Sequence, residues 1–147
     1  MPKYALDTSV YVAAVRAAGA DVALRRFLRT EATRTFLSAV VVQELRVGAR
    51  TPEQATALDR GIIDPFARRG RVFAPSPQAF YECGRVLPDL IRDEGLSDVG
   101  SSRSLVNDVL IATSCREQGI TLVTADRDFD LIAPYVKGLR YVSPFPA

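Results

Sequence analysis

An apolar run near the amino terminus ends abruptly in a carboxylate. Tyr4, Ala5 and Leu6 precede Asp7, and two hydroxyl residues follow before apolar residues resume. Such a run is typical of a buried parallel strand, and the pattern after Asp7 predicts a helix that begins at once. The stretch therefore places a carboxylate at the carboxyl end of a strand. Because aspartate, threonine and serine are also favoured helix N-caps, capping alone is an alternative role for it.

Strand and helix patterns alternate along the rest of the chain. The expected strands are 3–6, 35–38, 71–74, 120–124 and 140–142. The expected helices are 8–18, 22–29, 39–49, 51–68, 78–93, 104–118 and 126–132. This alternation predicts an α/β fold, a three-layer α/β/α sandwich with a mainly parallel central sheet. The length of 147 residues, without repeats or linkers, indicates that residues 1–147 form a single domain.

Three residues predict local features of these helices. Asp21 is expected to cap the helix at 22–29. Pro65 is expected to kink or end the helix at 51–68, because proline removes a backbone donor. For the same reason, Pro88 is expected to interrupt the helix at 78–93.

The composition restricts the available chemistry. Histidine is absent, and Cys83 and Cys115 are isolated, so no zinc site is expected and both cysteines are interpreted as reduced core residues. General acid–base catalysis near neutral pH would need a perturbed carboxylate, lysine, tyrosine or cysteine, or a metal-bound water. No signal-peptide pattern or bilayer-length apolar stretch occurs, which predicts a cytoplasmic protein without a membrane partner.

Two carboxylates follow predicted strands. Asp7 ends the strand at 3–6, and Asp126 comes just after the strand at 120–124. In parallel sheets, sites form in the crevice outside the carboxyl ends of the strands, so these two acids are expected to lie close together. A cap or turn role is the alternative for Asp126, and Asp128 is an alternative fourth acid.

Two further carboxylates, Glu44 and Asp108, lie within predicted helices. Their neighbours at helical spacing are apolar or small: Val40, Val41, Val47 and Gly48 for Glu44, and Leu105, Ile111, Ala112 and Cys115 for Asp108. A carboxylate on such a face must be paired, protonated or bound to a cation. A buried ion pair with a distant arginine is the alternative for Glu44.

Carboxylates that converge repel one another, and a hard divalent cation relieves this repulsion. Mg²⁺ and Mn²⁺ prefer carboxylate and water oxygens, and they can activate a water and stabilise charge on a phosphate. The sequence thus predicts a Mg²⁺ or Mn²⁺ site whose ligands and catalytic groups are Asp7, Glu44, Asp108 and Asp126. The residues expected to support these acids are Thr8, Ser9, Asn107, Thr124 and Asp128.

These motifs resemble those of PIN-domain ribonucleases, specifically the VapC-type toxins of type II toxin–antitoxin pairs. The resemblance covers nearly the whole chain. It rests on Leu6-Asp7-Thr8-Ser9, Val42-Gln43-Glu44-Leu45, Asn107-Asp108-Val109-Leu110-Ile111-Ala112 and Leu122-Val123-Thr124-Ala125-Asp126-Arg127-Asp128-Phe129. It implies a Mg²⁺- or Mn²⁺-dependent endoribonuclease with four acids at Asp7, Glu44, Asp108 and Asp126. It also implies a homodimer, and inhibition by a small antitoxin protein whose C-terminal segment covers the site.

The arginines acquire a candidate role from this resemblance. The net charge of +2 does not by itself indicate nucleic-acid binding, but only Lys3 and Lys137 are lysines among the 19 basic residues. Arginine suits bidentate phosphate contacts, although genome base composition can produce the same bias. The candidate RNA-binding residues are Arg25, Arg26, Arg29 and Arg103, the last of them in a polar loop at 97–103 that could border a substrate groove. A solvated helix face is the alternative for the first three.

Two other functions fit parts of the sequence. A PIN-type nuclease that acts in RNA processing or on DNA without an antitoxin would carry the same acids. A regulatory module similar to a phospho-receiver domain would also have acids at strand ends. Receiver domains need paired acids just after the first strand and a lysine near a late strand, whereas Asp7 is followed by hydroxyls and neither lysine is so placed.

Overall fold

Five parallel strands form the central sheet of the protein. The structure is a computed structural model that describes residues 1–16, 19–95 and 103–144. The strands are β1 (Lys3–Leu6), β2 (Thr35–Ser38), β3 (Val72–Phe73), β4 (Ile120–Val123) and β5 (Tyr141–Val142). Their order across the sheet is β3-β2-β1-β4-β5, and every neighbouring pair is parallel.

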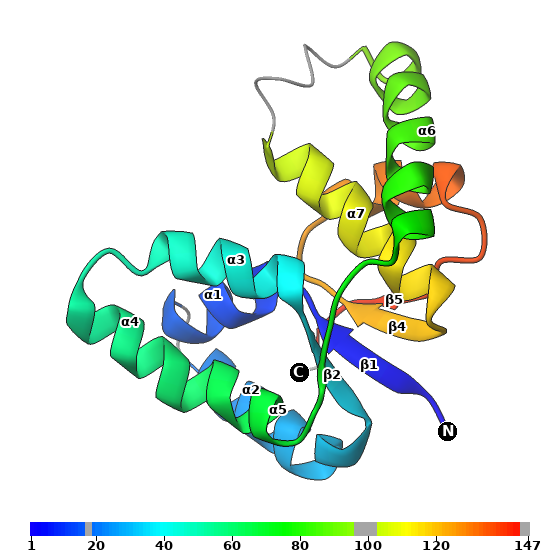
Figure 1. Cartoon of the computed structure of the whole chain (residues 1–147). Helices are drawn as coiled ribbons and strands as arrows, with labels where there is room; N and C mark the ends of the chain where they lie inside the picture. The colour runs from blue at the N-terminus through cyan, green and yellow to red at the C-terminus, as the bar shows by residue number, and fades with distance from the viewer. Residues whose placement is uncertain (17–18, 96–102, 145–147) are drawn as a thin grey trace.

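Helices flank this sheet. They are α1 (Thr8–Arg16), α2 (Ala20–Thr30), α3 (Ala39–Gly48), α4 (Pro52–Leu58), α5 (Asp64–Arg68), α6 (Pro77–Asp93), α7 (Arg103–Glu117) and α8 (Asp128–Ile132). Shorter turns are η1 (Ala32–Arg34), the π-helical η2 (Asp59–Ile63) and η4 (Ala133–Tyr135). In Figure 1, α1 to α5 gather at the left of the sheet, and α6 and α7 lie at its upper right. The predicted α/β sandwich with a parallel sheet is confirmed.

The sheet order creates a crevice between β1 and β4. The chain proceeds from β1 outward to β2 and β3, and then returns to add β4 and β5 on the other side of β1. In open parallel sheets, ligands bind where the order reverses in this way, outside the carboxyl ends of the strands. The register pairs Leu6 with Val123, so both strands end at the same level. This order also differs from the 2-1-3-4-5 order of receiver domains, which contradicts the receiver-like alternative.

Helix α7 passes through the core beside this crevice. Residues 108–115 are all buried, and they include the apolar or small Ile111, Ala112 and Cys115 of the predicted inward stripe. Gly119 has a positive φ of 67°, which lets the chain leave α7 and enter β4 with only two residues between the helix and the strand. Cys83 and Cys115 are buried free thiols, as expected. Within the described residues, no helix has the length and hydropathy needed to cross a membrane.

Three local predictions differ from the structure. Asp21 does not cap α2: Gly19 occupies the N-cap position, and Asp21 pairs instead with Arg25 at 3.3 Å. Helix α6 runs unbroken through Pro88, because Pro88 and Gly84 lie on the exposed face, where water can satisfy the carbonyl that proline leaves unpaired. Pro65 does not end the helix, because it lies in the first turn of α5, but the π-helical η2 immediately before it interrupts the regular α-helix there.

Candidate metal centre

Asp7 lies at the end of β1, where it is 3% exposed. One of its carboxylate oxygens, Oδ2, accepts hydrogen bonds from Ser9 Oγ at 2.9 Å and from Thr124 Oγ1 at 3.0 Å. Burial raises the pKa of Asp7, and the hydrogen bonds from Ser9, Thr124 and the backbone of Thr8 and Ser9 oppose that rise. The carboxylate therefore serves the start of α1 and also belongs to the crevice, so the two interpretations of Asp7 are compatible.

Two hydroxyl groups join the end of β1 to the turn after β4. Ser9 Oγ accepts a hydrogen bond from the Ala125 backbone N–H at 3.0 Å. Thr124 Oγ1 accepts one from the Asp126 backbone N–H, also at 3.0 Å. Since both hydroxyls also donate to Asp7, they hold the turn that carries Asp126 at a fixed position beside Asp7.

Asp108 enters the crevice from α7 and is 4% exposed. Its Oδ2 atom is buried without a hydrogen-bond partner in the described structure. Burial, followed by the charges of the other acids, raises the pKa of Asp108 to about 8; those acids are Asp7, Asp126, Glu44 and Asp128. An unpartnered buried oxygen among crowded negative charges is typical of a site that binds a cation.

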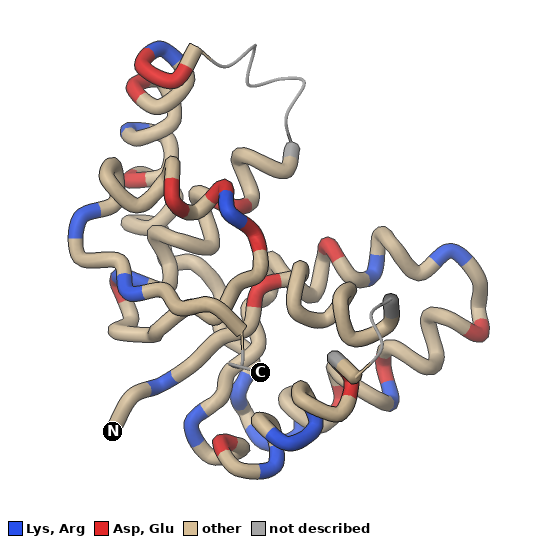
Figure 2. The backbone as a smooth tube through the Cα atoms, turned by 180° about the vertical axis from the view of Figure 1, so that it is seen from behind, with Lys and Arg blue, Asp and Glu red and all other residues tan. Residues whose placement is uncertain are grey.

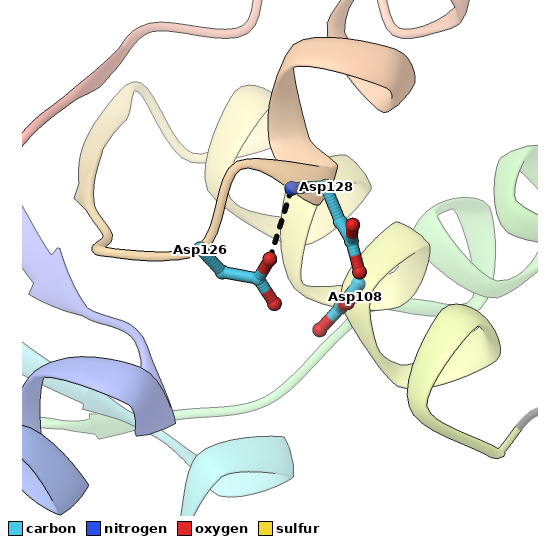
Figure 3. Close-up of side chains that lie close together, drawn as sticks. All are labelled: Asp108, Asp126 and Asp128. Atoms are coloured by element: carbon cyan, nitrogen blue, oxygen red, sulfur yellow. Dashed lines mark hydrogen bonds between the residues drawn. The ribbon is translucent and has the colours of Figure 1, made fainter.

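Asp126 and Asp128 complete a group of three acids with Asp108. One carboxylate oxygen from each lies within 4.8 Å of the others. Figure 3 shows the three carboxyl groups converging, with the Asp128 backbone N–H donating to Asp126 Oδ1 at 2.9 Å. Asp126 is half-buried and Asp128 is exposed, and burial together with the charge of Asp126 raises the pKa of Asp128. Both therefore remain candidates for the fourth acid.

Glu44 reaches the crevice from α3. Its Oε1 accepts a hydrogen bond from Thr8 Oγ1 at 2.6 Å, and its Oε2 accepts one from Asn107 Nδ2 at 3.4 Å. Glu44 is not part of the group of three within 4.8 Å, but its charge contributes to the raised pKa of Asp108. No arginine pairs with Glu44 in the described part of the chain, which argues against the ion-pair alternative.

The predicted burial of the helix face around Glu44 is confirmed only in part. Val40 and Val41 are buried, but Val47 is 69% exposed and Gly48 is exposed. Helix α3 is thus covered only in its first turns, and Glu44 lies half-buried at the boundary. The apolar pattern overestimated the burial of this face, because Val47 and Gly48 are exposed in the described structure.

The donor set fits a hard divalent cation. Carboxylates supply the oxygen ligands that Mg²⁺ and Mn²⁺ prefer, and the described residues offer neither histidine nor a paired cysteine to this crevice. Positive charge placed among Asp108, Asp126 and Asp128 would satisfy Asp108 Oδ2 and remove the mutual repulsion that raises the pKa of Asp108. Asp7 lies beside this group through its link to Thr124, and Glu44 is held on the α3 side.

The predicted RNA-binding arginines lie apart from these acids. Arg25, Arg26 and Arg29 are exposed on α2, and Arg25 pairs with Asp21. Figure 2 shows the basic residues of α2 at the lower edge of the molecule and acidic segments near its centre. The Arg103 side chain and the loop at 97–102 lie outside the described residues.

Arg127 was not among the site residues predicted from the sequence. This residue stands between Asp126 and Asp128, is exposed, and has a side chain that forms no ion pair or hydrogen bond with another described residue. Its position between two candidate acids is a signal that was visible in the sequence.

Comparisons with known proteins agree with this architecture. The family model of the PIN domain matches residues 4–134 of this chain. A comparison with curated protein sequences found no match. Among solved structures, one of DNA-bound VapBC from Salmonella typhimurium is similar with a TM-score of 0.70 and 22% identity, covering 97% of this chain and 98% of that chain.

Two further solved structures share the fold. FitAcB from Neisseria gonorrhoeae matches with a TM-score of 0.66 and 19% identity, covering 96% of this chain and 97% of that chain. VapBC2 from Rickettsia felis, bound to a promoter DNA fragment, matches with a TM-score of 0.64 and 20% identity, covering 95% of this chain and 97% of that chain. The family match spans most of the sequence and includes both strands that border the acidic crevice. The chain belongs to the PIN-domain family.

Proposed function

We propose that the protein is a metal-dependent endoribonuclease and the toxin of a type II toxin–antitoxin pair. The observation that carries this proposal is Asp108, a buried carboxylate with an unpartnered oxygen and four further acids around it. Maintaining such a cluster destabilises the fold unless a cation is bound, so a functional role explains it better than a structural one. The acids lie at the carboxyl edge of β1 and β4, which is where ligands bind in sheets of this order.

The cation ligands in this proposal are Asp7, Glu44, Asp108 and Asp126, with Asp128 as the alternative to Asp126. A bound Mg²⁺ or Mn²⁺ would lower the pKa of a coordinated water and stabilise negative charge on the phosphate. Ser9 and Thr124 orient Asp7, and Thr8 and Asn107 orient Glu44, through the hydrogen bonds described above. Burial of Asp7 and Asp108 keeps bulk water away from the inner side of the crevice.

The toxin assignment rests on the family and on its structural neighbours. The similar structures are of VapBC and FitAcB, and two of the VapBC structures are described as bound to DNA. By this likeness, the partners of the present chain are an RNA substrate, a second copy of the chain in a homodimer, and a small antitoxin protein. The proposal also includes a single domain over residues 1–147 and action in the cytoplasm, where these partners occur.

Cleavage of RNA by the purified protein tests the nuclease. Wild type is expected to cleave total RNA with Mg²⁺ or Mn²⁺ and to lose cleavage in EDTA, and Asp7→Asn and Asp108→Asn are expected to abolish it. Glu53→Gln, an exposed acid on α4, is the matched control and should cleave as wild type does. Retention of cleavage by both site variants in EDTA would overturn the metal mechanism.

A growth assay tests the toxin assignment separately. Expression of the wild-type chain is expected to arrest growth, the Asp108→Asn chain is expected not to, and co-expression of a small protein encoded beside the gene is expected to restore growth. RNA cleavage without growth arrest or a neighbouring antitoxin would instead support the antitoxin-free PIN nuclease.

A further inference from the structure

A hollow of about 470 Å³ opens at the carboxyl ends of β4 and β5. Its walls include Thr124, Asp126, Arg127, Asp130, Tyr141 and Val142. Asp126 belongs both to this hollow and to the group of three acids, so the two sites share a wall. The hollow is thus an extension of the acidic crevice toward the edge of the sheet, and its volume is within the usual range for small-ligand sites.

Arg127 supplies an available positive charge in this hollow. The carboxylates on either side of it converge on Asp108, and Asp126 Oδ1 also accepts a hydrogen bond from the Asp128 backbone N–H (Figure 3). Arg127 consequently forms no ion pair with its neighbours, although it stands directly between them. An exposed, unpaired guanidinium beside a cation site suits a phosphate, which it can contact through two parallel hydrogen bonds.

Tyr141 supplies a fixed aromatic wall. Its hydroxyl donates to Asp130 Oδ1 at 2.8 Å, which holds the half-buried ring in place at the start of β5. Val142 follows it with 46% exposure and adds apolar surface. Single-stranded RNA is recognised mainly by stacking of splayed bases on aromatic rings and by arginine contacts with phosphate. Both elements occur here within one hollow.

We propose that this hollow holds the nucleotide next to the cleaved bond, with its phosphate on Arg127 and its base against Tyr141. The inference rests on the proposed ribonuclease function and names a subsite for its substrate, single-stranded RNA. The reacting phosphate would lie at the cation that the acids at the ends of β1 and β4 hold, and the RNA chain would continue from there over β4 toward β5. The arginines of α2 lie outside this path, in contrast to the expectation drawn from the sequence.

Salt dependence of RNA binding tests the role of Arg127. Binding of a fluorescein-labelled ten-nucleotide RNA of random sequence is measured in the Asp108→Asn background, which prevents cleavage, with Arg127→Gln added. The affinity is expected to fall, and the slope of log K against log salt is expected to decrease by about 0.7, the value for one phosphate contact on a single strand. Arg140→Gln is the matched control, because Arg140 is also exposed and forms no ion pair with a described residue, but it does not line the hollow.

RNA affinity and the nucleotide preference at the cleavage site test the proposed contact between Tyr141 and a base. Tyr141→Leu keeps apolar bulk but removes the aromatic face, and it is expected to weaken binding roughly tenfold, within the range measured for one stacked base. Nucleotide preference beside the cut, read by sequencing the product ends of total RNA, should relax in this variant. Tyr141→Phe loses only the hydroxyl and should keep the preference.

The outcomes separate the subsite from the ribonuclease itself. If wild type cleaves RNA but Arg127→Gln binds with an unchanged salt slope and Tyr141→Leu keeps its cleavage preference, the subsite is wrong and the nuclease stands. If Arg140→Gln reduces the slope as much as Arg127→Gln does, the effect is one of overall charge and the subsite is also wrong. If wild type neither binds nor cleaves RNA, the proposed function fails and the subsite fails with it.

Discussion

The Thr8 hydroxyl donates a 2.6 Å hydrogen bond to Glu44, which lies 36 residues further along the chain. The bond joins the first residue of α1 to the middle of α3 across the acidic crevice. Asn107 contacts the other oxygen of Glu44 at 3.4 Å from α7. Because Glu44 is only half-buried, these two contacts and not close packing determine the direction of its carboxylate.

Loss of the Thr8 hydroxyl is therefore expected to impair the site without unfolding the protein. Thr8→Val keeps the shape of the side chain but frees Glu44 Oε1, and RNA cleavage or cation affinity should fall roughly 10- to 100-fold, as for other residues that orient metal ligands. Thr8→Ser keeps the hydroxyl and should restore most of the activity. The rates are measured at several Mn²⁺ concentrations, and equal rates for Thr8→Val and wild type would contradict the orienting role.

The positions of most acids could be predicted from local pattern, for a physical reason. A strand that ends in a carboxylate fixes that carboxylate at the edge of the sheet, which located Asp7 and Asp126. A carboxylate within an apolar helical stripe is forced inward, which located Asp108. These rules depend on periodicity alone, so they hold without knowledge of the tertiary contacts.

What depends on tertiary contacts was not predictable. Val47 is 69% exposed although it lies at helical spacing from Glu44, and periodicity alone does not tell which apolar side chains of a helix other elements cover. The unbroken path of α6 through Pro88 depends on which face meets solvent. The subsite role proposed for Arg127 required the convergence of its two neighbours on Asp108, which leaves the guanidinium unpaired.

Without divalent cations, the protein is expected to lose stability as the pH rises. The pKa of Asp108 is about 8 in the folded state and near 3.8 when unfolded, so the folded protein binds this proton more tightly. The stabilisation is complete below about pH 4 and is lost progressively as the pH rises toward 8. Loss of this proton lowers the free energy of unfolding by at most about 6 kcal/mol. The raised pKa of Asp7 acts in the same direction.

Urea unfolding in EDTA between pH 5 and pH 9 measures this dependence. Asp108→Asn has no proton to lose, so its free energy of unfolding should fall much less over this range and should exceed that of wild type at pH 8. A wild-type stability that rises from pH 5 to pH 8 would contradict the raised pKa of Asp108.

Added divalent cations are expected to reverse that loss. A cation that binds only the folded state at a hundred times its Kd stabilises it by about 2.7 kcal/mol, which raises Tm by roughly 5–10 °C for a domain of this size. Thermal unfolding at pH 8 with Mn²⁺ or Mg²⁺ measures the shift without reliance on RNA cleavage. The Tm of Glu53→Gln should rise with added cation as that of wild type does. A similar rise in the Tm of Asp108→Asn would place the bound cation elsewhere.

Asp126 is expected to matter more than Asp128 for cation binding. Both carboxylates lie within 4.8 Å of Asp108, but Asp126 is half-buried and is fixed through Thr124, whereas Asp128 is exposed. A ligand held in place loses less conformational freedom on binding, so Asp126→Asn should reduce the Mn²⁺-dependent Tm shift and RNA cleavage more than Asp128→Asn does. Isothermal titration with Mn²⁺ ranks the two variants directly. The reverse ranking would make Asp128 the fourth acid, because its exposed side chain would then be the one that closes on the cation.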